Sequence, residues 1–378
     1  GYSCIKGLRY HEIHHSPDRL RVPLKRVGDR FEEISWERAL SEIGSKIRKL
    51  VSEQGGDSVS AYLGNPISFS LMPPILTAAF LQGLGSRNLF QTGSQDCNNK
   101  FAASERVYGF PFIHPVPDVD RTQCLILIGT NPAVSRGSFI QLPHPVRRLR
   151  AIEERGGRVF HVNPRRTETA KQLGTQVFIR PDTDVYFLLS FLHEVLRRDA
   201  VDHQRVRAHM KGLDALRNVA DAWSPERTSG VTGISAEQLR EMVDAYVGAD
   251  GAALHLSTGV NQGSQGTLAY WIQESINAIT GNLDRLGGTI VGRGYIEDFA
   301  KHARKGGHTM RKDLSRIGQL PSVADTFPAG LMADEILTPG DGQVRALFCI
   351  AGNPLLTVPN ANGRLEEALK AIELLVVI

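Results

Sequence analysis

Two of the four cysteines lie where packing does not explain them, and a thiolate there could do chemistry. Cys4 and Cys97 are surrounded by Gly, Ser, Asn and Lys residues, whereas Cys124 and Cys349 lie inside apolar runs typical of core strands. Four cysteines this far apart are too few for a disulfide framework. Because the thiolate is the form that acts as nucleophile or metal ligand, Cys4 and Cys97 are candidates for a chemical role.

A second group of candidates is formed by glycine and asparagine turns that follow apolar strands. Residues 127–132 (Leu-Ile-Gly-Thr-Asn-Pro) are echoed by residues 349–354 (Cys-Ile-Ala-Gly-Asn-Pro), about 220 residues later. In doubly wound sheets, ligands bind at the carboxyl ends of strands, where small residues let the backbone approach phosphate or ribose. The echo suggests two related α/β units that face one long ligand. Chance similarity between two turns is the alternative.

Other expected strand ends carry groups suited to a nucleotide. After the strand at 158–162, a polar residue at the strand tip could hold ribose hydroxyls, and the arginines that follow could neutralise a pyrophosphate. Residues 180–184 lead into a helix, residues 257–262 offer amides suited to a heterocycle, and residues 280–288 form a glycine-rich loop. Each segment alone is a turn; together they place nucleotide-holding groups at every expected strand end.

Several other classes of protein are excluded or disfavoured. The sequence has no phosphate-binding P-loop, no G-x-G-x-x-G after a strand and no H-E-x-x-H, and residues 262–266 are one place out of register for a nucleophile elbow. A net charge of +4 is too small to indicate nucleic acid. No apolar run approaches the length of a membrane helix, so we expect no membrane span.

The chain has one uneven basic segment between two glycine-rich stretches. It combines five basic residues with two histidines: Lys301, Arg304, Lys305, Arg311, Lys312, His302 and His308. We interpret it either as a solvated loop or as a surface for an anionic group or an acidic electron-transfer partner. A partner subunit that exchanges electrons is therefore one expectation.

The elements that must position these residues alternate along the chain. Apolar runs predict strands at 59–63, 124–128, 158–162, 177–179, 252–256 and 344–350. Helical spacing predicts helices at 36–50, 73–83, 145–155, 185–198, 268–279 and 365–372, and residues 1–30 are expected to be extended loop. This alternation predicts an α/β protein with two doubly wound, mostly parallel sheets covered on both faces, plus a small N-terminal piece.

The ordered set of motifs resembles the oxidoreductases that bind two molybdopterin guanine dinucleotides, such as formate dehydrogenase and periplasmic nitrate reductase catalytic subunits. The motifs are Cys-x-Lys-Gly at 4–7, Ser-Pro-Asp-Arg-Leu at 16–20, Pro-Leu-Lys-Arg at 23–26, Ile-Ser-Trp at 34–36, Gly-x-Asn-Pro at 129–132, Asn-Pro-Arg-x-Thr-x-Thr at 163–169, Arg-Pro-x-Thr-Asp at 180–184, Thr-Gly-Asn-Leu at 280–283 and Gly-Asn-Pro at 352–354. The resemblance covers nearly the whole chain.

The resemblance implies a role for individual residues. Cys4 matches the last of four cysteines that hold a [4Fe–4S] cluster, and Lys6 matches a lysine that relays electrons between cluster and pterin. The residues implied for one guanine-dinucleotide site are Gly129, Asn131, Asn163, Arg165 and Asp184. Gly352 and Asn353 are implied for the other, and Gly259, Asn261 and Gln262 for the pterin. The three upstream cysteines are absent from the sequence, so we expect either that its N-terminal part is missing or that the cluster has been lost. A fourth, cofactor-covering domain is also absent, and we interpret the sequence as a fragment.

The protein ligand of the metal is left open by the sequence. Relatives supply Cys, selenocysteine, Ser or Asp from the loop at 93–104, and alignment on Asp96 and Lys100 places Ala102 near the formate dehydrogenase ligand. A thiolate is a soft ligand suited to molybdenum, so Cys97 is our candidate, followed by Asp96 and Ser104. No protein ligand at all is the alternative. The His that follows the ligand in formate dehydrogenases is missing, which disfavours formate.

The resemblance also implies a domain plan and a function. We expect residues 1–58 to be the remnant of an iron–sulfur domain, residues 59–103 and 336–378 to form one α/β domain, and residues 104–335 to be inserted into it. The function implied is two-electron redox or oxygen-atom transfer on a small molecule at molybdenum or tungsten, since the cofactor carries such chemistry. Two alternatives are a non-catalytic electron-transfer scaffold, similar to the large subunit of NADH dehydrogenase, and a generic nucleotide-binding hydrolase or transferase. The substrate and the compartment, cytoplasmic or periplasmic, stay open.

Overall fold

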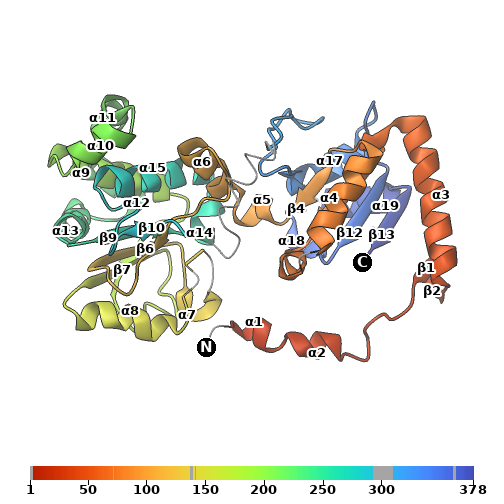
Figure 1. Cartoon of the computed structure of the whole chain (residues 1–378), viewed down its shortest axis with the longest axis horizontal. Coiled ribbons are helices and arrows are strands. Elements are labelled where there is room, and N and C mark those ends of the chain that lie inside the picture. The colour runs from red at the N-terminus through yellow and green to blue at the C-terminus, as the bar shows by residue number, and fades with distance from the viewer. Residues whose placement is uncertain (1–2, 71, 137–138, 141, 293–309, 361–362) are drawn as a thin grey trace. The chain divides into compact units, whose positions relative to one another are not determined.

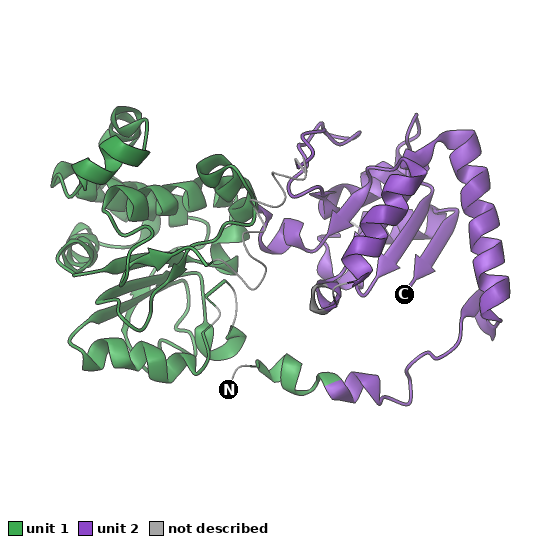
Figure 2. Cartoon of the chain, viewed as in Figure 1, with its two compact units in different colours: residues 1–10, 99–309 green, residues 11–98, 310–378 purple. Residues whose placement is uncertain are grey.

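The chain forms two compact units, which Figure 2 distinguishes by colour. This computed structural model describes residues 3–70, 72–136, 139–140, 142–292, 310–360 and 363–378. Unit 1 is made of residues 1–10 and 99–309, and unit 2 of residues 11–98 and 310–378. Most of the basic segment noted above, residues 301–309, lies outside the described residues. The expected domain plan, with boundaries near 103 and 335 and a separate N-terminal piece, stays a prediction.

Unit 1 is built on a parallel sheet of four strands. In chain order these are β6 (Cys124–Ile128), β7 (Arg158–Asn163), β8 (Thr175–Phe178) and β9 (Ala252–Leu256), and they lie side by side as β8-β7-β6-β9. Every residue of β6 and β9 is buried, as expected for strands covered on both faces. Numbered along the chain the strand order is 3-2-1-4, so the order reverses between β6 and β9.

Helices cover both faces of this sheet (Figure 1). Leu149 and Ile152 of α8 (Pro145–Glu154) pack on one face, against Leu125 and Leu127. The other face carries α9 (Asp184–Arg197), α13 (Ala236–Val247) and α15 (Gly266–Ile279). The sequence did not predict α13, nor the three helices that lie between it and α9 in the chain, namely α10 (His203–His209), α11 (Leu213–Asp221) and α12 (Pro225–Thr232).

Unit 2 contains a parallel sheet of five strands. These are β3 (Val59–Leu63), β4 (Leu89–Gln91), β11 (Phe327–Pro328), β12 (Ala346–Ile350) and β13 (Leu374–Val377), arranged as β11-β4-β3-β12-β13. The order along the chain is 3-2-1-4-5, which repeats that of unit 1. Helices α3 (Trp36–Gln54) and α4 (Met72–Leu84) pack on one face, and α17 (Met332–Leu337) and α19 (Arg364–Ala371) on the other. The expected fold class of two doubly wound α/β units is confirmed.

The N-terminal segment departs from the extended loop expected over residues 1–30. It contains α1 (Ile5–Leu8), α2 (Tyr10–His14) and an antiparallel hairpin of β1 (Leu24–Val27) with β2 (Arg30–Glu33). Helix α3 begins as predicted, because the Ser35 hydroxyl accepts a hydrogen bond from the backbone N–H of Arg38 at 3.2 Å. Within the described ranges, every helix is too short or too polar to cross a bilayer.

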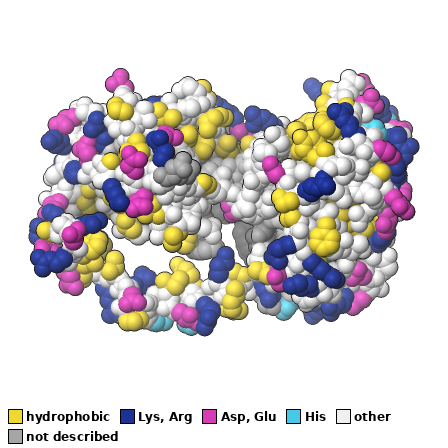
Figure 3. All heavy atoms as spheres, turned by 180° about the vertical axis from the view of Figure 1, so that it is seen from behind, with side chains coloured by type: hydrophobic (Ala, Val, Ile, Leu, Met, Phe, Trp, Pro, Cys, Tyr) yellow, Lys and Arg dark blue, Asp and Glu magenta, His cyan; other side chains and the backbone are white. Residues whose placement is uncertain are grey.

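The remaining elements are mostly short. They are α5 (Gly93–Asp96), α6 (Asn98–Tyr108), β5 (Val116–Pro117), α7 (Pro132–Ser135), α14 (Thr258–Asn261), β10 (Thr289–Ile290), α18 (Pro354–Thr357) and the 3-10 turns η1 (Gly56–Ser58), η2 (Asn65–Phe69) and η3 (Ala329–Leu331). Strands β5 and β10 pair with each other as an antiparallel two-stranded sheet. On the face drawn in Figure 3, Lys and Arg side chains are interspersed with Asp and Glu, consistent with the small net charge of +4.

Candidate functional site

Two glycines meet where the strand order of unit 1 reverses. Gly129 follows β6 with a φ of +62°, and its carbonyl accepts a hydrogen bond from the backbone N–H of Gly259 at 3.0 Å. A Cβ on Gly259 would lie 2.8 Å from the Cα of Gly129, and a Cβ on Gly129 would lie 2.9 Å from the backbone nitrogen of Val260. Neither position can carry a side chain without a shift, because the two glycine backbones pack directly against each other. Their contact joins the ends of the two strands at the edge where open α/β sheets bind ligands.

The residue between Gly129 and Asn131 was not among those expected from the sequence. The Thr130 side chain is 6% exposed, and its hydroxyl has no hydrogen-bond partner among the described residues. A buried polar atom without a protein partner is uncommon in a folded protein, so this hydroxyl is a candidate for contact with a bound group. Thr130 therefore joins the candidate site. Its position at the end of an apolar strand was the available signal.

Asn131 lies in a network of side chains at the ends of β6 and β7. Its Oδ1 accepts hydrogen bonds from the backbone N–H and the hydroxyl of Thr169, at 3.2 and 2.8 Å, and its Nδ2 donates to Glu168 Oε2. Arg165 donates to both oxygens of Glu168, at 3.3 and 3.2 Å. The Arg165 hydrogen bond and that of Asn131 lower the pKa of Glu168 to about 2, so the carboxylate stays ionised. Asn163, the last residue of β7, accepts the backbone N–H of Arg165 at 3.2 Å.

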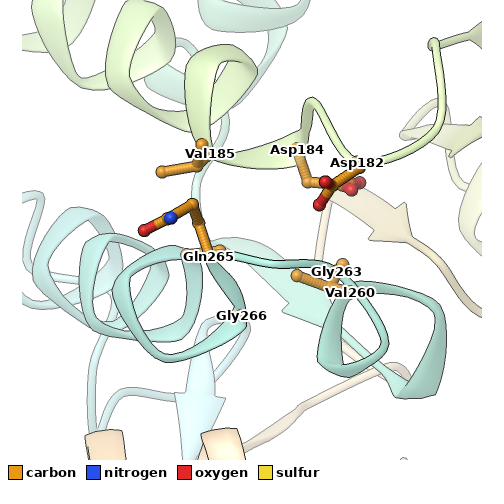
Figure 4. A pocket seen from close by; sticks show the side chains of 8 residues that line it. Asp182, Asp184, Val185, Val260, Gly263, Gln265 and Gly266 are labelled. Atoms are coloured by element: carbon orange, nitrogen blue, oxygen red, sulfur yellow. The ribbon is translucent and has the colours of Figure 1, made fainter.

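Asp184 lies in a shallow pocket at the start of α9. The pocket has a volume of about 170 Å³, part of which is open solvent, and Val260, Gly263 and Gln265 line the side opposite Asp184 (Figure 4). Burial raises the pKa of Asp184 to about 6, and the charge of Asp182 adds to the rise. Asp182, at a φ of +64°, accepts the backbone N–H of Ser264 at 2.7 Å and thereby holds the turn after α14. A carboxylate at the edge of a pocket can accept paired N–H donors of a heterocycle.

Asn261 is one of the residues implied for the pterin, and its side chain is engaged within unit 1. It is 5% exposed; its Oδ1 accepts the backbone N–H of Lys100 at 3.3 Å, and its Nδ2 donates to the Tyr270 hydroxyl at 2.8 Å. Its backbone carbonyl also accepts from the Asn99 amide at 2.7 Å. Gln262, the next residue, is exposed. Asn261 thus holds the start of α6 in place.

Unit 2 has a matching pair of glycines at its own reversal of strand order. Gly64 follows β3 and Gly352 follows the adjacent strand β12, and a Cβ on Gly64 would lie 1.9 Å from the carbonyl oxygen of Ala351. Gly352 and Asn353 were expected from the sequence, whereas Gly64-Asn65-Pro66 was missed, although these residues repeat the Gly-Asn-Pro string. Asn65 and Asn353 are both exposed, each at the end of its strand.

The segment expected to supply a metal ligand, residues 93–104, begins with α5, and Cys97 directly follows this helix and is partly buried. The backbone N–H of Cys97 donates to the Gly93 carbonyl at 2.8 Å. The flanking side-chain oxygens Gln95 Oε1 and Asn98 Oδ1 are buried and have no hydrogen-bond partner among the described residues. This is an arrangement that would accommodate a further group beside Cys97. Asp96, by contrast, is exposed.

Two other residues of the loop at 93–104 belong to the interior of unit 1. The Ser104 hydroxyl is 3% exposed and donates to the backbone carbonyls of Phe110 and Ile113, at 3.0 and 2.5 Å, so it is engaged away from any ligand. The Lys100 side chain is 2% exposed, with its ammonium 4.4 Å from the centre of the Phe139 ring, within the range of a cation–π contact. Because the Ser104 hydroxyl is engaged in the interior, Cys97 is the better-placed candidate for the protein ligand to the metal.

Cys4 and Lys6 lie at α1. The backbone N–H of Gly7 lowers the pKa of the Cys4 thiol against the opposing effect of burial, and the Lys6 charge adds to the lowering. A lowered pKa favours the thiolate that a cluster requires. In the described part of the chain, however, no group of three or more His, Cys, Asp or Glu residues is placed to hold a metal. The described residues therefore do not form a [4Fe–4S] site by themselves.

Comparison with known proteins identifies the family to which this chain belongs. Residues 19–378 match the family described as molybdopterin oxidoreductase, and the chain belongs to that family. The resemblance drawn from the motifs is thereby confirmed, and membership implies a molybdenum or tungsten pterin cofactor.

The individual relatives include enzymes with different substrates. The chain is 24% identical over its whole length to the F420-dependent formate dehydrogenase 1 subunit alpha of Methanococcus maripaludis, of which it covers 56%. It is 24% identical to the assimilatory nitrate reductase catalytic subunit of Bacillus subtilis, covering 54%. Acetylene hydratase from Pelobacter acetylenicus has the same fold, with a TM-score of 0.82 at 20% identity over all of this chain and 55% of that one. The chain spans about half the length of these relatives.

Proposed function

We propose that the chain is the dinucleotide-binding part of an oxidoreductase that uses molybdenum or tungsten held by two molybdopterin guanine dinucleotides. The proposed reaction is two-electron redox or oxygen-atom transfer on a small substrate, with electrons passing through a [4Fe–4S] cluster in the full-length protein. When bound, the metal and its pterins supply the redox chemistry, and the protein supplies binding, orientation and electrostatics.

The observation that carries this proposal is the repeated glycine contact. Two units with the same strand order each place a pair of glycines, Gly129 with Gly259 and Gly64 with Gly352, at the point where that order reverses. This is where open α/β sheets bind nucleotides. Two such places match two dinucleotides, one for each unit.

In unit 1 the roles follow from the contacts. Gly129 and Gly259 let the turns after β6 and β9 pack closely together, while Asn131, Asn163 and Arg165 present amide and guanidinium groups at the ends of β6 and β7. The Asp184 carboxylate would accept the N–H groups of guanine. Asn261 positions the start of α6, and the exposed Gln262 is available to the pterin.

In unit 2, Gly352 and Asn353 would hold the second dinucleotide, and Cys97 is the proposed protein ligand to the metal. Lys6 is proposed as the electron relay beside the cluster ligand Cys4. The described residues do not complete a cluster site, so a cluster at Cys4 would need further ligands from outside them.

A second candidate function is a non-catalytic electron-transfer scaffold of the same fold, similar to the large subunit of NADH dehydrogenase. The observation that favours it is Ala102, which stands near the position where formate dehydrogenases place their metal ligand. Ala102 is a small, apolar and buried residue of α6, 9% exposed, and it cannot bind a metal. The retained glycine pairs favour the catalytic form.

Analysis of the full-length protein tests the two functions. We expect about one molybdenum or tungsten per chain, two pterins detected by fluorescence after acid oxidation, and two GMP molecules released by hydrolysis of the pyrophosphates. Pterin and GMP without metal would favour the scaffold. Absence of metal, pterin and GMP from protein produced in cells that make the cofactor would refute the catalytic function and favour the scaffold, which needs no bound pterin. Metal and pterin without GMP would refute the dinucleotide form.

A further inference from the structure

Two of the groups proposed to hold a dinucleotide in unit 1 converge on one carboxylate of the chain itself. Asn131 donates through Nδ2 to Glu168 Oε2, and Arg165 donates through two guanidinium nitrogens to Oε1 and Oε2. A planar guanidinium paired with two oxygens is the geometry that arginine uses for carboxylates and phosphates alike. The same donors would therefore fit a phosphate in the place of the carboxylate.

The direction of the Asn131 amide is fixed by its other neighbour. Because Oδ1 accepts both the backbone N–H and the hydroxyl of Thr169, the NH2 group must face Glu168. Thr169 is fully buried, and its own hydroxyl oxygen accepts the backbone N–H of Ala133 at 3.0 Å. Asn131 is thus a donor held in place by the interior of unit 1, with its NH2 group pointing at an anion.

The other two groups are held less firmly. The side chains of Arg165 and Glu168 are 60% and 44% exposed, and they are three residues apart in the loop after β7. Exposed ion pairs of this kind are weak and sensitive to salt. Glu168 can therefore leave Asn131 and Arg165 by a side-chain rotation, while Asn131 stays where it is.

An independent observation in the same turn also points to a ligand. Thr130, beside Asn131, is more than nine-tenths buried and its hydroxyl has no partner among the described residues. A hydroxyl donor next to an amide donor, at a strand end lined by Gly129, is a combination suited to phosphate oxygens.

We infer that Glu168 stands in for a ligand phosphate: its carboxylate occupies Asn131 and Arg165 in the ligand-free chain and competes with the pyrophosphate of the bound nucleotide. This inference rests on the proposed function, since it takes the unit 1 site to bind a dinucleotide. By this inference Glu168 lowers the affinity of the unit 1 site for the nucleotide. The phosphate-binding part of the site is then formed by Asn131, Arg165 and Thr130.

The test uses the purified chain, titrated at low ionic strength with inorganic pyrophosphate, GDP and guanosine. We expect Glu168→Gln to raise the affinity for pyrophosphate and GDP roughly two- to fivefold, the range that an exposed ion pair of this strength allows. Guanosine has no phosphate, and its affinity should not change. Glu154→Gln removes the same charge from an exposed position of α8 and should leave all three affinities unchanged.

A second variant separates competition from a general charge effect. Adding Arg165→Gln to Glu168→Gln should abolish the gain, because the guanidinium that the carboxylate blocks is then absent. The inference is overturned if Glu168→Gln lowers pyrophosphate affinity or leaves it unchanged, or if neither protein binds pyrophosphate. If pyrophosphate binding rises but GDP binds no better than pyrophosphate and guanosine does not bind, the inference holds and the guanine-dinucleotide assignment fails.

Discussion

The side-chain oxygen of Asn261 accepts a hydrogen bond from the backbone N–H of Lys100 at 3.3 Å, which ties the turn after β9 to the first residues of α6. The other end of the same amide donates to Tyr270 at 2.8 Å. Two parts of unit 1 that are far apart in sequence therefore depend on one buried side chain. Asn261, which the resemblance implies for the pterin, is therefore held in position by contacts within unit 1.

The first prediction concerns this amide. Asn261→Ala removes both hydrogen bonds at a buried place and takes away the acceptor of the Lys100 backbone N–H, so the free energy of unfolding should fall by about 1–3 kcal/mol. Urea unfolding followed by circular dichroism measures the change. The control is Asn218→Ala, an exposed residue of α11 whose replacement should change the free energy by no more than about 0.5 kcal/mol. An unchanged midpoint for Asn261→Ala would show that the amide does not support the fold.

The second prediction concerns the glycine contact in unit 2. Gly64→Ala would place a Cβ 1.9 Å from a backbone oxygen, so the strand ends must separate, and we expect a loss of about 1–3 kcal/mol or more. Gly83 lies in α4 with no atom within 4 Å of the Cβ it would gain. Gly83→Ala should therefore stabilise the chain by about 0.5–1 kcal/mol. If the two substitutions shift thermal unfolding in the same direction, the steric argument is wrong.

The third prediction concerns Asp184 and how the stability of the fold and the affinity for guanine change with pH. Burial raises the pKa of this carboxyl to about 6, above its ordinary 3.8. A raised carboxyl pKa stabilises the fold at pH below 3.8, and that contribution is lost as the pH rises through about 6. Guanine N–H donors require the ionised carboxylate, so the affinity for guanine should change in the opposite direction and increase with pH.

Guanosine is the suitable probe for this dependence, because the second ionisation of a phosphate also falls near pH 6. Between about pH 8 and pH 5 the affinity of the chain for guanosine should fall about tenfold, following the ionised fraction of Asp184. Asp184→Asn should bind weakly at every pH, and Asp214→Asn, at an exposed carboxylate of α11, should behave as the unmodified chain. A pH-independent affinity in the unmodified chain would argue against contact between Asp184 and guanine.

Local patterns in the sequence predicted β3, β6 and β9 with the bounds that the structure shows. The same patterns made Gly129 and Gly352 candidates, because each follows an apolar run and lies just before an Asn-Pro pair. Gly64-Asn65-Pro66 was missed although it carries the same letters, because its importance depends on β12 lying beside β3. Asn261 binds Lys100, and Asn131 binds Thr169, although the members of each pair are distant in the sequence. Periodicity in the sequence does not predict such pairs.

The prediction for the N-terminal segment was wrong, because it missed secondary structure that the segment contains. Its Pro, His, Arg and Gly residues indicated extended loop, yet residues 5–14 form two short helices whose residues are nearly all exposed. Short helices with no buried face leave no apolar periodicity in the sequence, so composition was the only guide.

The position of β12 in the sheet of unit 2 has a consequence for biosynthesis. The Ser60 hydroxyl of β3 donates to the Ala346 carbonyl of β12 across 286 residues, and β12 lies between β3 and β13. On the ribosome, β3 and β4 emerge before unit 1 is translated. Until β12 has also been translated, the edge of β3 that pairs with β12 stays unpaired. We expect unit 1 to fold first and the nascent β3–β4 segment to require chaperone protection, so slower translation of unit 1 should increase aggregation of the nascent chain.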